Sequence, residues 1–287
     1  MASKCTVRSI SLPSRSHPSV LRVEEELNKL KNWEAESKST SGSVFNGLSL
    51  LEELYICLDE FLNMGSTQQV ISRRQGEEFV EELLDGSVRI LDICGITRDT
   101  MLQIKENVQA LHSSLRRRKG DSTIEKSKAE YAIFTRKMKK DSKKLIIDLK
   151  KMESKFGVSP LLSADPHLAS VVRVLREVIA MNISVFQSLL SFLAVPVSKA
   201  KATKWLLVAR LMHSGGIACE ENVNELQSVD VALSTLLSEG IDAQKMQAAH
   251  QRLEALEIVI ESLENSLERV FRRLIKTRSS LLNIISQ

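Results

Sequence analysis

Hydrophobic residues recur along this chain at spacings of three and four, and strict alternation over the length of a strand is hard to find. That period places apolar side chains on one face of an α-helix. The five prolines leave residues 19–159 and 197–287 without one, so long helices can form in both stretches. We therefore predict an all-α protein, a multi-helix bundle with long antiparallel helices.

Turn residues divide the pattern into segments. Pro18 and Pro166 mark helix starts, because Pro fits the first helical turn without losing a hydrogen bond. Residues 37–43 are expected to form a loop, and Gly95 to interrupt a helix that Asp99 then restarts. The apolar stripes span residues 20–30, 44–62, 79–84, 101–115, 124–152, 168–193, 223–237 and 246–284, with a shorter helix around 205–212.

The last segment carries the most regular pattern, with steps of three and four from Met246 to Ile284. This is the a/d repeat of a heptad. Val259, Phe271 and Ile275 widen the apolar face beyond a two-stranded seam. We therefore predict a heptad-patterned C-terminal helix that is buried in the bundle, in preference to a dimeric coiled coil.

Charge is unevenly distributed, although the net charge is only +4. Residues 116–155 contain 15 Lys plus Arg against 6 Asp plus Glu. Without interleaved aromatic residues or a nucleic-acid motif, this surplus indicates a charged helix with a solvated face and no nucleic-acid partner. On the last helix the acids precede the bases, as the helix dipole favours. The alternative there is a basic amphipathic end that docks on anionic lipid or on a helix-binding protein.

Residues 178–198 are uncharged and long enough to span a bilayer. Polar side chains within this segment share one helical face, as expected of a helix packed in a bundle. They are Ser184, Gln187, Ser188 and Ser191. We favour a buried helix, with a membrane span as the alternative.

Residues that could carry catalysis or bind a metal or a cofactor form no recognisable motif. The four cysteines lie far apart, so neither a zinc site nor a disulfide framework is expected. The five histidines are scattered, and no phosphate-binding loop or nucleophile elbow occurs. We therefore expect no catalytic residue, no metal and no cofactor, and a protein that is not an enzyme.

The N-terminus contains the most specific short motif. Arg8, Ser11 and Pro13 match the form that phosphoserine adaptors of the 14-3-3 type recognise. Phosphate on Ser11 would add nearly two negative charges for an arginine cluster, and Pro13 would turn the chain away. We expect residues 1–18 to form a flexible, basic, serine-rich tail and residues 19–287 to form a single helical domain.

Five stretches of the sequence resemble the BYPASS-type family of plant proteins. They are residues 8–18, 84–95 with 98–99, 115–118, 136–140 and 271–284. The resemblance implies a role in root and shoot development, and it implies no established reaction, cofactor or active site. No catalytic residue is carried over from the family.

These observations predict a non-enzymatic plant regulatory or scaffold protein that acts through helical protein-protein contacts, with docking through phosphorylated Ser11. The alternative is a membrane-associated protein that uses residues 178–198 or the basic C-terminal helix. An enzyme with an unrecognised pocket has no support in the sequence. No apolar secretory leader opens the chain, so a cytoplasmic location is favoured, with membrane association or the plastid as alternatives.

Overall fold

The computed structural model describes residues 17–37, 40–74, 77–116, 121–156, 166–194, 224–238 and 243–287. The described residues form helices and no strand, so the predicted all-α class is confirmed. The helices are α1 (Pro18–Glu36), α2 (Ser41–Leu62), α3 (Gly65–Ser72), α4 (Glu78–Arg116), α5 (Asp121–Phe156), α6 (Pro166–Ala194), α8 (Glu225–Ser238) and α9 (Ala243–Ile285).

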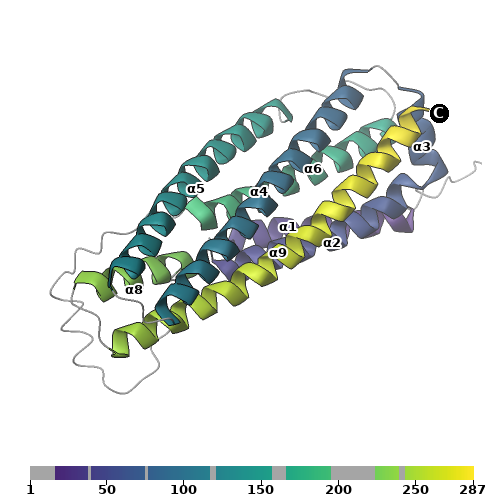
Figure 1. The fold of residues 1–287 in the computed structure, drawn as a ribbon. Coiled ribbons are helices and arrows are strands. Elements are labelled where there is room, and N and C mark those ends of the chain that lie inside the picture. Colours follow the sequence, from purple (N-terminus) through teal and green to yellow (C-terminus); the bar gives the residue numbers. More distant parts are fainter. Residues whose placement is uncertain are drawn as a thin grey trace, which may run out of the picture.

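Long helices run side by side along an elongated bundle (Figure 1). α4 and α9 are antiparallel neighbours, and α2 packs along α9 on another side. α5 packs against α4 and α6, while α6 also contacts α1 and α2. One cluster of buried hydrophobic side chains includes residues of every long helix, so the helices share a core.

Helix starts follow the expected chemistry. Pro18 opens α1, and the His17 side chain accepts a hydrogen bond from the Ser19 amide. Pro166 opens α6 as predicted. The predicted loop at 37–43 is shorter than expected, because Thr40 caps α2 and the helix begins at Ser41.

Two expectations about local structure were wrong. α4 continues through Gly95, and a Cβ at Gly95 would meet no atom within 4 Å. A single glycine costs a helix only about 1 kcal/mol, which the packing of a long helix outweighs. Asp99 therefore lies inside α4 and caps nothing. The second error is that Gly65 begins the short helix α3, where no helix was expected.

The C-terminal helix matches its predicted pattern. Its buried side chains continue the steps of three and four from Ala249 to Ile284. α9 contacts α2, α3, α4 and α8, so its apolar face is buried in a bundle. The shorter helix expected around 205–212 lies outside the described residues.

Candidate basic groove between α5 and α8

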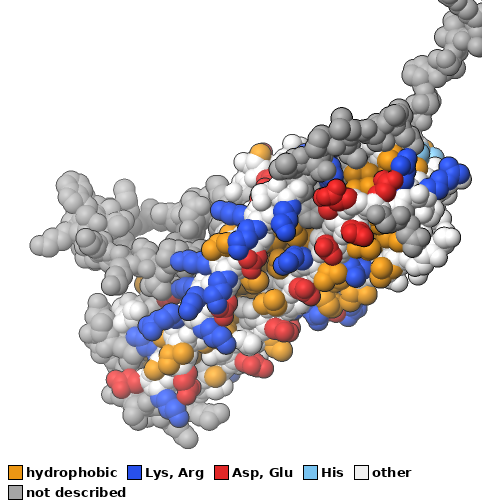
Figure 2. Space-filling view, turned by 90° about the horizontal axis from the view of Figure 1, so that it is seen from above, with side chains coloured by type: hydrophobic (Ala, Val, Ile, Leu, Met, Phe, Trp, Pro, Cys, Tyr) orange, Lys and Arg blue, Asp and Glu red, His pale blue; other side chains and the backbone are white. Residues whose placement is uncertain are grey.

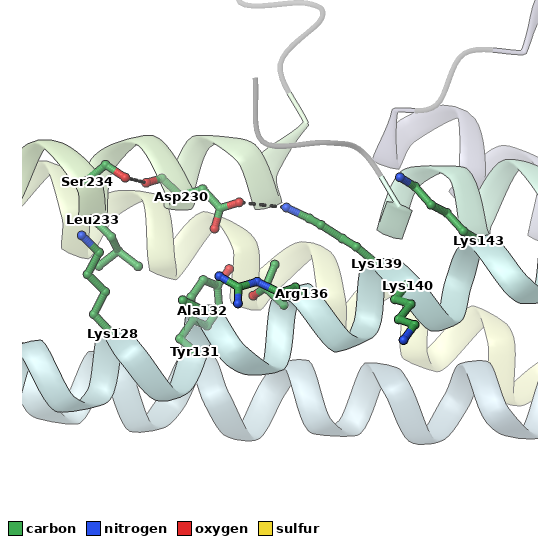
Figure 3. A pocket seen from close by; sticks show the side chains of 11 residues that line it. Lys128, Tyr131, Ala132, Arg136, Lys139, Lys140, Lys143, Asp230, Leu233 and Ser234 are labelled. Atoms are coloured by element: carbon green, nitrogen blue, oxygen red, sulfur yellow. Dashed lines mark hydrogen bonds and ion pairs between the residues drawn. The ribbon is translucent and has the colours of Figure 1, made fainter. Parts of the chain in front are cut away.

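A groove of about 550 Å³ lies between the first half of α5 and α8. Five of its lining side chains are cations, all from α5, and one is a carboxylate from α8; Figure 3 shows Lys139 reaching Asp230 across the groove, whereas Lys140 points away from α8. The lining residues are Lys128, Tyr131, Ala132, Thr135, Arg136, Lys139, Lys140, Lys143, Asp230, Leu233 and Ser234.

The helical period of α5 explains why these side chains share the groove. Tyr131 and Met138 lie on the buried stripe that packs into the core. Lys128, Lys139 and Lys143 follow one another at spacings of eleven and four, so they share one edge of that stripe. α8 packs against α9 and not closely against α5, so the groove between α8 and α5 stays open.

One ion pair joins the two walls. Lys139 Nζ lies 3.0 Å from Asp230 Oδ2, and the two side chains are only 13% and 12% exposed. This pair neutralises the one carboxylate that lines the groove. The other cations, Lys128, Arg136, Lys140 and Lys143, form no ion pair within the described part of the chain.

Two hydroxyl groups at the floor of the groove are buried without a hydrogen-bond partner of ordinary geometry. They are Tyr131 Oη and Thr135 Oγ1, on side chains that are 2% and 4% exposed. Burial raises the pKa of Tyr131, the nearby Asp230 raises it further, and a weak hydrogen bond with Thr135 opposes the rise. Tyr131 is therefore a neutral hydroxyl that can donate a hydrogen bond at physiological pH.

Several cations elsewhere in the bundle contact acids on neighbouring helices. On α9, Arg269 Nε lies 2.7 Å from Glu52 Oε2, and Lys276 Nζ lies 2.8 Å from Asp59 Oδ2. Arg278 donates to the Leu84 carbonyl and to Ser87 on α4. The acid-then-base order of α9 therefore serves contacts between helices, and the expected solvated face is only part of the explanation.

Figure 2 shows Lys and Arg side chains gathered on one face of the bundle, along the region of α5. The predicted charged, solvated helix at residues 116–155 is thus correct for much of α5. Sequence reasoning missed the groove, although the spacing of Lys128, Arg136, Lys139 and Lys143 placed these cations near one edge of the helix. Nothing in the sequence indicated that α8 forms the opposite wall.

The described cysteines and two of the described histidines pack against other side chains of the bundle. Cys57 and Cys94 are buried free thiols, and burial raises the pKa of Cys94 to about 12. Among the described residues, no three His, Cys, Asp or Glu side chains gather closely enough to hold a metal ion. The rings of His112 and His250 contact each other in a tilted arrangement, with centroids 5.0 Å apart and an interplanar angle of 51°.

Arg8, Ser11 and Pro13 lie outside the described residues, so docking through phosphorylated Ser11 stays a prediction. The uncharged stretch at 178–198 falls mainly in α6. Of the helices described, α6 alone is long and apolar enough to cross a membrane, and 67% of its most apolar window is buried in the bundle. Its polar face contacts neighbouring helices, since Ser184 donates to Glu34 on α1.

The described residues thus form an all-α bundle with a basic groove on its surface. The family model described as Protein BPS1 matches residues 47–284, which is most of the chain. The chain therefore belongs to the BPS1 family, a plant developmental family of unknown biochemical function. This confirms the resemblance to the BYPASS type. No curated protein and no solved structure matches the chain.

Proposed function

We propose that this chain is a non-enzymatic regulatory scaffold protein of root and shoot development. Its helical surfaces contact protein partners, and its groove between α5 and α8 holds an anionic group. Family membership supports the developmental role, and the groove supports the binding role.

The observation that carries the proposal is the set of four cations at the groove that have no acidic partner among the described residues. Several cations elsewhere in the bundle are matched by acids on neighbouring helices, as in the Lys31–Glu177 and Arg269–Glu52 pairs. Lys128, Arg136, Lys140 and Lys143 instead concentrate like charge around one hollow. Like charges at close range repel one another, and an anionic group bound between them removes that cost.

The proposal can be tested by complementation. Plants that lack the gene are transformed with the wild-type chain or with a groove variant that carries Lys128→Gln, Arg136→Gln and Lys140→Gln. We expect the wild-type chain to restore root and shoot growth and the groove variant to fail at equal protein level.

A matched control comes from the other edge of α5. Lys126, Lys137 and Lys144 are exposed and do not line the groove. Their replacement by Gln removes the same charge from the same helix, and this control variant should restore growth. Equal growth with the groove variant would contradict a role for the groove.

Docking through phosphorylated Ser11 is a separate part of the proposal. The full chain and its Ser11→Ala variant are purified from plant tissue, and purified 14-3-3 protein is added to each. We expect binding to the native chain that phosphatase treatment and Ser11→Ala both abolish. Binding that survives either change would contradict docking at Ser11.

A further inference from the structure

We infer that the groove between α5 and α8 binds a multiply phosphorylated small ligand, either soluble or as the headgroup of an anionic lipid. This inference rests on the proposal that the groove holds an anionic group, and it names the chemistry of that group. Its basis is the size of the groove, the spacing of its cations and the two buried hydroxyl groups at its floor.

The volume of the groove suits a small molecule. Pockets for small molecules and cofactors measure about 300–1,000 Å³, and this groove measures about 550 Å³. An α-helix with its side chains is about 10–12 Å across, so the same space would hold only about one helical turn. An acidic helix from a protein partner therefore could not enter deeply enough to reach the floor.

The cations are spaced for more than one anionic group. Lys128 and Arg136 flank the floor residues Tyr131 and Thr135, whereas Lys140 and Lys143 lie further along α5. From Arg136 to Lys143 is seven residues, which is about 10 Å along a helix axis at 1.5 Å per residue. Lys128 lies a further eight residues before Arg136, which is about 12 Å. A ligand with phosphates at two or more positions can contact both Arg136 and Lys143, while a single phosphate reaches only one of them.

The floor explains why phosphate fits better than a nonspecific counterion. Tyr131 Oη and Thr135 Oγ1 are buried, and within the described part of the chain they make no hydrogen bond of good geometry beyond a weak contact with each other, which is costly for a hydroxyl group. Both hydroxyls are hydrogen-bond donors, but each oxygen is covered in the free protein, so a phosphate oxygen reaches them only after the side chains above them shift. Lysine is a frequent phosphate ligand in proteins. Mobile ions around surface lysines would leave these two hydroxyl groups unsatisfied.

Asp230 is the lining group that opposes an anion. Its carboxylate is held by Lys139 at 3.0 Å, and Figure 3 shows this pair across the groove. The pair leaves the four remaining cations to act on the ligand. Asp230→Asn should therefore tighten binding, because it removes the negative charge and frees Lys139.

Binding is measured by calorimetry on the full chain with inositol hexakisphosphate as the probe, at 0.15 M salt. We expect saturable binding of one ligand per chain. The Lys128→Gln, Arg136→Gln, Lys140→Gln variant should bind at least tenfold more weakly. The control variant with Lys126→Gln, Lys137→Gln and Lys144→Gln should bind within threefold of wild type. Equal weakening by the two variants would overturn the inference, because it would indicate attraction by net charge alone.

The floor is tested by Tyr131→Phe combined with Thr135→Val. Because the two hydroxyl groups make only a weak contact with each other in the free protein, their removal should leave Tm unchanged or raise it. The same variant should bind inositol hexakisphosphate at least fivefold more weakly. Unchanged affinity would overturn the placement of phosphate at the floor, and a lower Tm without ligand would show that the hydroxyls are structural.

Two further binding measurements distinguish a lipid headgroup from a soluble phosphorylated ligand. Flotation is carried out with vesicles that contain a phosphatidylinositol bisphosphate, and with vesicles of equal charge that contain only phosphatidylserine. Binding to the first alone supports a lipid headgroup, and binding only to soluble inositol hexakisphosphate supports a soluble ligand. Equal binding to both vesicles, or to polyglutamate as strongly as to inositol hexakisphosphate, would overturn the inference.

The binding and complementation experiments together separate the loss of phosphate binding from the loss of the developmental role. If no phosphorylated probe binds but the groove variant fails to restore growth, the groove serves a different anionic group. If the probe binds and the groove variant restores growth fully, ligand binding is real and the proposed developmental role of the groove is wrong.

Discussion

Gly47 and Gly95 have opposite surroundings at the scale of the single residue, although both lie inside long helices. A Cβ added at Gly47 would lie 2.4 Å from Trp33 Cζ2, whereas at Gly95 it would meet no atom within 4 Å. The Trp33 ring cannot move away easily, because its Nε1 donates to the Ser43 carbonyl at 2.9 Å. Because Gly47 has no side chain, Trp33 of α1 can pack directly against the backbone of α2.

Gly47→Ala should therefore destabilise the protein, while Gly95→Ala should stabilise it. Overpacking against Trp33 costs about 1–3 kcal/mol, which exceeds the gain of about 1 kcal/mol from the helix propensity of Ala. At Gly95 only the gain applies. Urea unfolding of the two variants beside wild type measures both free energies, and a change of the same sign in both would contradict this account.

Polar residues in the core act at the same scale. Tyr55 on α2 donates to Asn182 Oδ1 on α6 at 3.0 Å, and Asn182 Nδ2 donates to the Val178 carbonyl. Both side chains are buried, so each satisfies the other. Asn182 therefore links α2 to α6 within the core.

At the scale of the element, α9 is the helix around which the others pack. Its buried positions repeat at three and four from end to end, and it contacts α2, α4 and α8 along its length. Charged residues at its edges reach the same neighbours, as when Lys105 on α4 pairs with Glu264. The buried apolar positions of α9 hold it in the core, and the ion pairs at its edges favour one alignment of α9 along α4.

Leu263→Asp should unfold the bundle or cost about 3–5 kcal/mol, because it places an unpaired charge in a buried seam. Leu263 is 1% exposed. Ile258→Asp is the control on the same helix, since Ile258 is 61% exposed and should change stability by less than about 0.5 kcal/mol. Circular dichroism during heating measures both, and unchanged melting of the Leu263 variant would refute its place in the core.

At the scale of the whole molecule, His250 on α9, which lies beside His112 on α4, links stability to pH. Burial lowers the pKa of His250, and His112 and Arg116 lower it further, while Glu254 opposes the effect. His112 Nδ1 lies 3.9 Å from Glu257 Oε2. The folded state therefore takes up a proton on His250 at a lower pH than the unfolded chain does.

Because the unfolded state binds more protons, the free energy of unfolding should fall as pH drops below about 7, and the contribution of His250 should level off below its folded pKa. His250→Gln should reduce this slope between about pH 7 and 5.5, above the range where carboxylates titrate. Urea unfolding across that range measures the slope. A wild-type free energy that rises on acidification would contradict the sign.

Burial of α6 leads to a second prediction for the whole molecule. Packing in the core accounts for the apolar composition of α6, so we expect alkaline carbonate to release the native protein fully from plant membranes. A span of α6 across the bilayer would instead make the protein resist this extraction. Resistance would contradict the bundle in the membrane-bound protein and support the membrane alternative.

The sequence by itself determined the helical class, the starts of α1 and α6 at Pro18 and Pro166, and the buried seam of α9. These features depend on the 3.6-residue period and on the missing amide of proline, which are local properties. The motifs within residues 84–140 and 271–284 also led to the correct family. Local rules failed at Gly95, because the packing of α4 along α9 outweighs the cost of one glycine.

Only the tertiary structure decided where the groove lies and which cations remain unpaired. The sequence placed fifteen basic residues in one stretch, but pairing depends on the acids that other helices bring near. Lys139 meets Asp230 from 91 residues away, and Arg269 meets Glu52 from 217 residues away. Such distances in sequence carry no periodic signal, since they are set by how the helices pack around their shared core.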